Sequence, residues 1–198
     1  MSQPSLPDDM PARPDSCATP GTHRLFFALW PDDATRVAIA AAAARLRLQA
    51  GSGRWAAMAR YHLTVQFLGT YRTMPQAVLG RARDAAADTS APAFSLTLDR
   101  VGSFRAHSHL WWLGSWRPEP LLPLWETLTE ALERHEVPVA SVPFVPHVTL
   151  VRGATRPPPE DAAVNPIVWP VSDFALIHSE SGARDVYRVV GRWPLVTG

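Results

Sequence analysis

Apolar and polar residues alternate along this chain with two different periods, and together the two periods predict an α+β fold. A period of two is typical of strands with one buried face, and a period of three to four is typical of amphipathic helices. We expect helices at residues 31–49, 75–87 and 121–135. We expect strands at residues 24–30, 61–68, 94–101, 109–113, 147–151, 171–177 and 185–193, with a hairpin formed by the 102–108 link.

The two halves of the chain resemble each other in the order of their elements. Each half contains one long helix and one strand with the sequence His-x-Thr. A weak internal repeat of this kind is typical of two similar lobes that face each other. We therefore expect a bilobal α+β fold of two antiparallel-sheet lobes, with helices on the outside and a central cleft.

The N-terminal segment differs in composition from the rest of the chain. Residues 1–22 are rich in proline and carry acidic residues where a secretory signal has a basic cap and an apolar run. Cys17, the single cysteine, also lies here, so neither disulfides nor a cysteine-ligated metal holds the fold. No segment approaches the ~20 consecutive apolar residues of a membrane helix. We predict a disordered tail at residues 1–22, one domain at residues 23–198, and a cytoplasmic protein with no obligate protein partner.

The charge of the chain limits the partners that it binds. The formal net charge is only +1, which argues against a large non-specific DNA-binding surface. A small anion site remains compatible with this balance. All 19 positively charged residues are arginine, so any cationic contact with phosphate uses a guanidinium group, and a lysine nucleophile is excluded.

Two short motifs carry the candidate chemistry, His62-Leu-Thr64 and His147-Val-Thr149. Residues two apart in a strand project from the same face, so each histidine shares a face with its threonine. Histidine acts as acid and as base near neutral pH, and threonine hydroxyls donate hydrogen bonds to phosphate oxygens. If the two strands meet, the four side chains suit the transfer of a phosphodiester, which then requires no metal and no other cofactor.

The motifs alone are weak signals. With 7 His and 13 Thr in 198 residues, random placement gives about 0.5 His-x-Thr pairs. A histidine on a half-buried strand is more often structural than catalytic. The sequence around the motifs therefore decides whether they form a site.

That surrounding sequence resembles the two-histidine phosphoesterase superfamily, and specifically its RNA 2′,3′-cyclic phosphodiesterases, also called the 2′-5′ RNA ligase family. The similarity extends over nearly all of residues 24–195. It rests on Arg24-Leu-Phe-Phe-Ala-Leu29, Arg54-Trp55, His62-Leu-Thr-Val-Gln-Phe-Leu-Gly69, Phe104, Leu110-Trp-Trp-Leu-Gly114, Pro146-His-Val-Thr-Leu-Val-Arg152, Leu176-Ile-His-Ser179, Tyr187 and Arg192-Trp-Pro-Leu195. Where relatives often have prolines after Arg-Trp, this chain has Ala56-Ala-Met58. This departure affects a loop, and so the substrate range more than the chemistry.

The resemblance implies a bilobal α+β fold with the two motifs facing each other in the cleft. It assigns His62 as proton donor and His147 as proton acceptor, with Thr64 and Thr149 binding the phosphate and Arg152 as a further anion contact. It implies an RNA 2′,3′-cyclic 3′-phosphodiesterase that acts on RNA ends or nucleotides bearing a 2′,3′-cyclic phosphate. Three alternatives stay open: another cyclic or 2′-5′ linked nucleotide as substrate, reversible 2′-5′ ligation, and a non-catalytic protein that binds RNA ends.

Three tryptophans near the middle of the chain have ring faces on which nucleic-acid bases stack, namely Trp111, Trp112 and Trp116. Strand alternation places one of Trp111 and Trp112 in the core. Base stacking at the others is the less favoured interpretation. His107 and His109 lie two apart, but the sequence around them favours a surface hairpin over a metal site.

Overall fold

The computed structural model describes residues 21–105, 109–139, 143–159, 162–181 and 186–197. Three α-helices lie in these segments: α1 (Asp33–Arg47), α2 (Gln76–Ala87) and α3 (Leu122–Arg134). Short 3-10 turns, η1 (Met58–Arg60) and η2 (Glu119–Leu121), precede β3 and α3. The strands are β1 (His23–Leu29), β2 (Arg54–Trp55), β3 (Leu63–Tyr71), β4 (Phe94–Leu98), β5 (Arg100–Arg105), β6 (His109–Gly114), β7 (His147–Ala154), β8 (Ile167–Val171), β9 (Asp173–Glu180) and β10 (Val186–Pro194).

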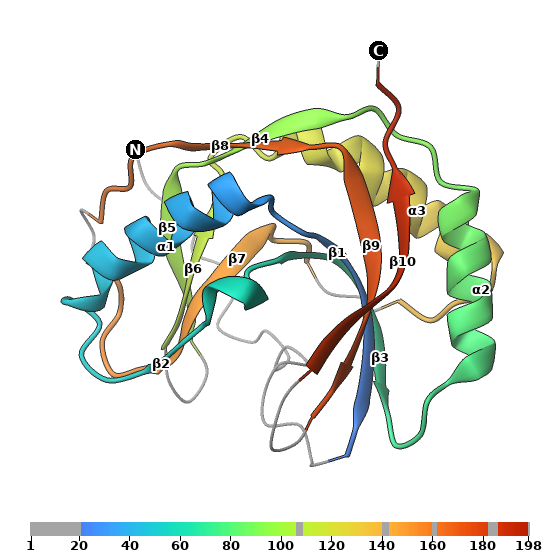
Figure 1. Ribbon diagram of the computed structural model, residues 1–198, viewed down its shortest axis with the longest axis horizontal. Helices are drawn as coiled ribbons and strands as arrows, with labels where there is room; N and C mark the ends of the chain where they lie inside the picture. Colours follow the sequence, from blue (N-terminus) through green and yellow to red (C-terminus); the bar gives the residue numbers. More distant parts are fainter. Residues whose placement is uncertain (1–20, 106–108, 140–142, 160–161, 182–185, 198) are drawn as a thin grey trace.

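One antiparallel sheet organises the molecule (Figure 1). Its strand order is β10-β9-β1-β3-β7-β6-β5, with β2 paired to β7, and β4 and β8 form a separate two-stranded sheet. The strands that carry the two His-x-Thr motifs, β3 and β7, are neighbours in the middle of this order. The two strands are joined by a single register pair, Leu63 opposite Val148. The sheet therefore has two halves that meet at the motifs.

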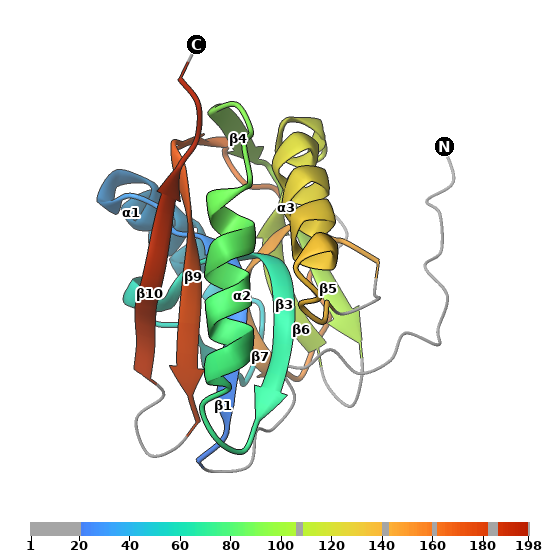
Figure 2. The same ribbon diagram turned by 90° about the vertical axis from the view of Figure 1, so that its right-hand side faces the viewer.

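The helices lie on both halves of the sheet, and their placement does not follow chain order. Figure 1 shows α1 on the side that carries β5, β6 and β7, although α1 directly follows β1 in the sequence. Figure 2 shows α2 and α3 side by side on the other half. A hydrogen bond of 2.8 Å between His135 Nε2 and Asp88 Oδ2 links the C-terminal ends of these two helices.

The core lies between the sheet and the helices. Alternate strand residues and the apolar stripes of the helices fill it, and its largest fully buried side chains include Trp111, Trp169, Phe27 and Phe174. A smaller apolar cluster, formed by Phe26, Ala28, Ala175 and Ile177 with Trp30, Phe67 and Tyr187 packed against it, occupies the opposite face of the sheet. That opposite face is the face of the motifs, as the site geometry below shows.

The α+β class predicted from the sequence is confirmed, as are the helices, whose observed ends lie close to the predicted ones. The strand predicted at residues 94–101 is wrong as one element, because it ends at Leu98 and a second strand begins at Arg100. Asp99 separates them, and β4 pairs with β8 whereas β5 pairs with β6. The predicted 102–108 link is strand as far as Arg105, and its remaining residues, including His107, lie outside the described residues.

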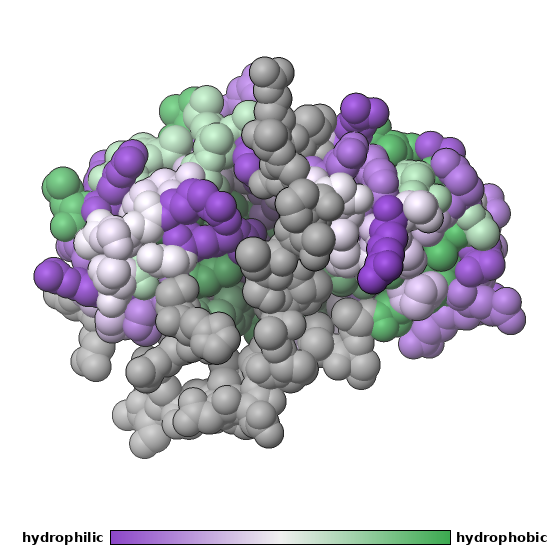
Figure 3. Space-filling view, turned by 90° about the horizontal axis from the view of Figure 1, so that it is seen from below, coloured by the Kyte–Doolittle hydropathy of each residue, from purple (hydrophilic) through white to green (hydrophobic). Residues whose placement is uncertain are grey.

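Two strands have no counterpart in the sequence prediction. Strand β2 has only two residues, and β8 precedes the strand predicted at residues 171–177, with Ser172 separating β8 from β9. The two halves are hydrogen-bonded parts of one sheet. The bilobal shape and the central cleft remain predictions. Seen from below, the part of the described surface that is in view mixes hydrophilic and apolar residues (Figure 3).

The beginning of the described chain is held by Ser181, which directly follows β9. Residues 1–20 lie outside the described part of the structure, whereas Gly21 and Thr22 are bound to Ser181 by main-chain hydrogen bonds of 2.7 and 2.9 Å. Among the described residues, no helix is both long enough and apolar enough to cross a membrane.

Candidate active site

The junction between β3 and β7 places both motifs on one face of the sheet. Leu63 and Val148 are directly opposite each other and both are fully buried in the core. Directly opposite residues of an antiparallel pair project from the same face, and their chain neighbours project from the other. His62, Thr64, His147 and Thr149 therefore share the face away from the core. The same register sets His62 across from Thr149 and Thr64 across from His147. The four side chains therefore form a rectangle on this face, with the two histidines at diagonally opposite corners.

A β-bulge follows the first motif immediately. Thr64 and Gln66 of β3 lie opposite Ala28 and Phe27, which are consecutive residues of β1, so Val65 is the extra residue of the bulge. Both Val65 and Gln66 are buried, and Gln66 forms a hydrogen bond to Thr129 of α3. An extra residue in a strand resets the alternation of faces that follows it.

The second motif is followed by the same irregularity. Thr149 and Val151 of β7 lie opposite Trp112 and Trp111, so Leu150 is the extra residue, and both Leu150 and Val151 are fully buried. The next residue, Arg152, returns to the face of the motif. The spacing is His-x-Thr-x-x-Phe67 in β3 and His-x-Thr-x-x-Arg152 in β7. The two halves of the site are therefore built alike, but one ends in an aromatic ring and the other in a cation.

Main-chain carbonyls orient both imidazole rings in the same way. His62 Nδ1 lies 2.8 Å from the carbonyl oxygen of Arg60, and His147 Nδ1 lies 2.7 Å from that of Val145. A carbonyl oxygen only accepts, so Nδ1 is the donor in each pair. The neutral ring then has its lone pair on Nε2, and the protonated ring has a proton there to give. Each histidine is thus prepared to act through Nε2 as base or as acid.

Aromatic rings surround His62. Its ring stacks on Trp30 at 5.8 Å between centroids and contacts Phe26 at 5.2 Å and Tyr187 at 5.3 Å. The guanidinium of Arg60 lies 4.8 Å from the centre of the Tyr187 ring and donates to its hydroxyl over 3.3 Å. Arg60 thus contributes its carbonyl to the histidine and its side chain to the neighbouring tyrosine.

His147 has an aromatic environment of its own. Phe104 contacts its ring edge-on at 5.0 Å between centroids, and Trp112 lies at 6.1 Å. The indole of Trp112 lies across Gly102, since a Cβ on that glycine would be 2.2 Å from Cζ2 of the indole. Glycine is therefore required at this position of β5 for Trp112 to reach His147.

The five residues predicted for the site fall on one face of the sheet. His147 is nearly buried at 9% exposure, whereas His62, Thr64, Thr149 and Arg152 are half-buried. The pairing of β2 with β7 adds a cation that sequence reasoning did not assign, because Arg54 lies directly opposite Arg152. Its only sequence signal was the Arg-Trp pair of the family resemblance. The phenol of Tyr61, which precedes His62, is buried, and this burial raises its pKa, so Tyr61 stays neutral.

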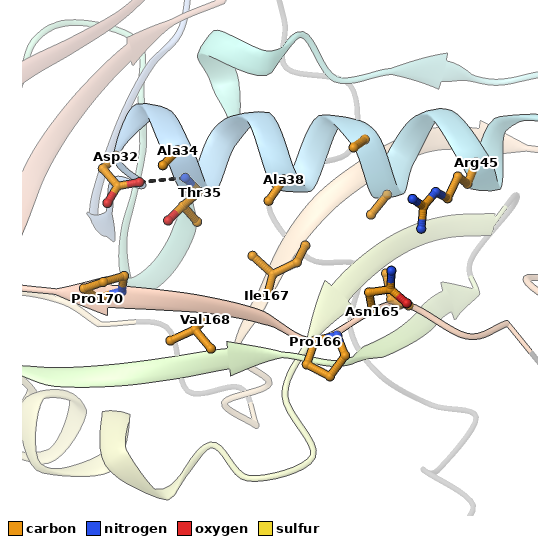
Figure 4. Close-up of a pocket in the computed structure, with 13 residues that line it drawn as sticks. Asp32, Ala34, Thr35, Ala38, Arg45, Asn165, Pro166, Ile167, Val168 and Pro170 are labelled. Carbon is orange, nitrogen blue, oxygen red and sulfur yellow. Dashed lines mark hydrogen bonds between the residues drawn. The ribbon is translucent and has the colours of Figure 1, made fainter.

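A cavity of about 500 Å³ lies elsewhere, between α1 and residues 164–170 (Figure 4). Alanines form much of its helical wall, and its polar side chains lie at opposite ends, with Asp32 and Thr35 at one and Arg45 and Asn165 at the other. Asp32 caps α1 by accepting from Thr35 N over 2.7 Å, and this hydrogen bond lowers the pKa of its carboxyl. Asp32 thus serves the helix, and the polar side chains at the two ends of the cavity do not converge on one point. Among the described residues, no three His, Cys, Asp or Glu side chains gather as a metal site would require.

The fold and the paired motifs define a family. The chain belongs to the 2′-5′ RNA ligase superfamily, whose family model matches residues 31–183. The chain is 33% identical to the RNA 2′,3′-cyclic phosphodiesterase of Escherichia coli (strain K12) over 156 residues, which cover 73% of this chain and 81% of that protein. It is 29% identical to the RNA 2′,3′-cyclic phosphodiesterase of Geobacillus stearothermophilus over 150 residues, and the match spans 48% of that protein.

Solved structures with the same fold include those of the family. The crystal structure of E. coli LigT complexed with 3′-AMP superposes with a TM-score of 0.69 at 28% identity, over 88% of this chain and 98% of that one. The crystal structure of a Thermus thermophilus protein, TT0787, gives a TM-score of 0.68 at 27% identity, over 86% of this chain and 97% of that one. These similarities confirm the family resemblance that the sequence motifs predicted.

Proposed function

We propose that this protein is an enzyme that opens the 2′,3′-cyclic phosphodiester ends of RNA to 2′-phosphomonoesters by acid and base catalysis. His62 and His147 are the catalytic residues of this proposal, and Thr64, Thr149 and Arg152 bind the phosphate. The observation that carries it is the antiparallel register of β3 and β7, which sets two histidines and two threonines at alternate corners of one face. The family and the names of the relatives supply the substrate class.

The diagonal arrangement suits displacement at phosphorus. The attacking and the departing oxygen lie on opposite sides of the phosphorus atom, so the base and the acid need to approach from opposite sides. His147 Nε2 takes a proton from water, whose oxygen bonds to phosphorus while the P–O3′ bond breaks. His62 Nε2 gives its proton to O3′. Solvent then returns both rings to their starting protonation states.

The remaining polar groups of the site act on the phosphate. Charge accumulates on its non-bridging oxygens in the transition state, and the hydroxyls of Thr64 and Thr149 donate hydrogen bonds to them. The planar guanidinium of Arg152 adds a bidentate cationic contact. Protonated imidazole and these donors supply what a Lewis acid supplies elsewhere, so in this proposal the reaction needs no metal or other cofactor.

The alternatives share the site and differ in the substrate. Free cyclic nucleotides, 2′-5′ linked oligonucleotides and the reverse ligation all require the same acid and base. A non-catalytic binder of RNA ends does not require two oriented histidines. The composition and the single cysteine favour the cytoplasm as the compartment in which RNA ends are met.

Turnover of a defined substrate panel in EDTA tests the proposal. We expect the purified protein to convert an oligonucleotide with a 2′,3′-cyclic phosphate to the 2′-phosphate, as identified by product analysis. His62→Ala and His147→Ala should each lower kcat by roughly a hundredfold or more, the usual contribution of a general acid or base. The matched control is His135→Ala, because His135 binds Asp88 at the ends of α3 and α2 and has no part in the proposed site. Full activity of either motif variant, or protection of the end without turnover, would contradict the proposal.

A further inference from the structure

A row of side chains extends from His147 across the sheet to its outer edge. Arg100 of β5 lies directly opposite Gly114 of β6, and Gly114 lies directly opposite His147 of β7. Directly opposite residues share a face, so Arg100 projects from the same face as His147, two strands away. Two strand spacings amount to roughly 10 Å. Strand β5 is the last strand on this side of the sheet (Figure 1).

Contacts between rings and guanidinium groups connect this row. The position between Arg100 and His147 is a glycine, and the indole of Trp112 lies against it, because a Cβ on Gly114 would be 2.8 Å from Cζ3 of the indole. The guanidinium carbon of Arg100 lies 5.6 Å from the centre of the Trp112 ring and 4.2 Å from that of Trp116. The contacts therefore run without interruption from His147 to Trp116.

The outer end of the row is open to solvent, and a hydrogen bond holds the turn that carries it. Trp116 is 60% exposed, which is unusual for so large an apolar side chain. Its main-chain nitrogen donates to Asp99 Oδ1 over 2.9 Å, and this carboxylate thereby holds the turn. Arg117, the next residue, is also exposed. An exposed indole beside cations is a surface on which a nucleic-acid base stacks.

The guanidinium group of Arg100 has no hydrogen-bond partner among the described residues. In the described segments of the chain, the side chain of Arg100 makes no hydrogen bond and no ion pair, and its guanidinium contacts the two indoles. A guanidinium group has five N–H donors, and stacking on a ring leaves them in the plane of the group, where they reach a phosphate. The nearby carboxylate of Asp99 is directed to the main chain of Trp116.

We propose that Arg100 and Trp116 form a second nucleotide subsite, which binds the nucleotide on the 5′ side of the cyclic end. This proposal rests on the proposed function, because it places the cyclic phosphate between His62 and His147. The base of the preceding nucleotide stacks on the exposed face of Trp116, and the phosphate that joins it to the terminal nucleoside contacts Arg100. The subsite makes the enzyme select RNA ends over free cyclic mononucleotides.

Three substrates and three variants test the subsite in the chain of 198 residues. The substrates are a cyclic mononucleotide, a dinucleotide that ends in a 2′,3′-cyclic phosphate, and the same dinucleotide without its first base. Trp116→Ala should lower kcat/KM for the intact dinucleotide about tenfold, as the loss of one base stack does, and leave the mononucleotide unchanged. Removal of the first base should lower wild-type turnover similarly, and Trp116→Ala should then have no additional effect. Arg47→Ala, an exposed arginine at the end of α1, is the matched control.

A salt series identifies the phosphate contact separately. For the dinucleotide, Arg100→Gln should reduce the slope of log kcat/KM against log salt concentration by roughly 1, the amount expected for the loss of one phosphate contact. For the mononucleotide the slope should not change. An equal loss on the mononucleotide and the dinucleotide, or no loss on either, would overturn the subsite. If the wild-type protein hydrolyses neither substrate, the proposed function fails. In that case equal dinucleotide affinity of the wild type and Trp116→Ala, measured by titration, would also overturn the subsite, and weaker binding by the variant would support it.

Discussion

Each motif histidine is held by the carbonyl oxygen of the residue two positions before it. Met58–Arg60 forms a 3-10 turn ahead of His62, and residues 143–146 form an irregular segment ahead of His147. Neither carbonyl belongs to a β-ladder at that position, so each remains available to accept from Nδ1. The start of a strand is therefore the position at which this chain can fix an imidazole ring by its own main chain.

The threonine hydroxyls are expected to act on the phosphate and not on the fold. Thr64→Val and Thr149→Val keep the shape of the side chain and the branching at Cβ but remove the donor. We expect each to lower kcat by about a hundredfold, because a donor to the developing charge is lost, and to leave the melting temperature nearly unchanged. Steady-state kinetics and a thermal melt check this. Thr97→Val in β4 is the control, and an equal loss in that variant would contradict the assignment.

His178 gives the fold a dependence on pH that is separate from the site. Burial lowers the pKa of His178, the charge of the neighbouring His23 lowers it further, and Arg188 acts in the same direction while Glu180 opposes them. His178 Nε2 and His23 Nδ1 share a hydrogen bond of 2.9 Å. The folded protein thus favours the neutral ring. Its contribution to stability is complete above the ordinary value of 6.5 and decreases as the pH falls below it.

Urea unfolding at about pH 7.5 and about pH 5.5 measures this contribution. We expect the free energy of unfolding to fall more between these two values in the wild type than in His178→Gln, which has no ring to protonate. Identical decreases in the two proteins would show that His178 does not contribute. The His62 and His147 sites are unchanged in both proteins and cancel in the comparison.

At the level of secondary structure, two β-bulges give the site its composition. Val65 and Leu150 each follow a motif threonine as the extra residue of a bulge. Without the bulges, strict alternation would direct Phe67 and Arg152 toward the core, where an arginine is strongly unfavourable. The bulges therefore bring a ring to one half of the site and a cation to the other.

Strand β5 contributes to the site through a residue without a side chain. Gly102→Ala would place a Cβ 2.2 Å from Trp112, so the indole would have to move away from His147. We expect this variant to lose about 1–3 kcal/mol of stability and to have a lower kcat. Gly80→Ala is the matched control, since a Cβ there meets nothing within 4 Å and the residue lies inside α2.

The control should change stability in the opposite direction. Alanine in the interior of a helix is favoured over glycine by about 1 kcal/mol, so Gly80→Ala should be more stable with unchanged kcat. Denaturant unfolding measures the stability of both variants, and steady-state kinetics measure their kcat. A Gly102→Ala protein as stable and as active as the wild type would show that the Trp112 contact is not needed.

For the whole molecule, the junction of β3 and β7 determines how the two halves of the sheet are placed. The junction has one register pair, and the two residues of that pair are fully buried. Leu63→Ala should lower the free energy of unfolding by about 2–5 kcal/mol. It should also lower kcat, because the cavity on the core side loosens the packing that holds the two motif strands in register.

Leu96→Ala in β4 separates stability from geometry. Leu96 is 1% exposed and belongs to the two-stranded sheet, so its truncation should have a similar cost in stability. We expect kcat of this variant to match the wild type well below its melting temperature. If both variants lose kcat in the same proportion, the junction has no special part in positioning the histidines.

Much of this arrangement follows from the sequence alone. Alternation in residues 61–68 and 147–151 was sufficient to predict that His62 shares a face with Thr64 and His147 with Thr149, because side-chain direction in a strand depends on local geometry. The helices were predictable for the same reason, since their apolar stripes have the period of a helix. The two motifs supplied four of the candidate site residues, and the flanking sequence identified the family and added Arg152.

Only the tertiary structure decided how these parts combine. The pairing of β3 with β7 joins residues more than 80 positions apart, and no local pattern encodes such a register. The same holds for Asp99, where two strands with different partners replace one predicted strand, and for α1, which packs beside the half of the sheet that does not contain β1. Strand partners, bulges and helix placement depend on which surfaces bury each other across the whole chain. The sequence therefore determined which residues are candidates for the chemistry, and the fold determined that the two motifs lie together on one face of the sheet.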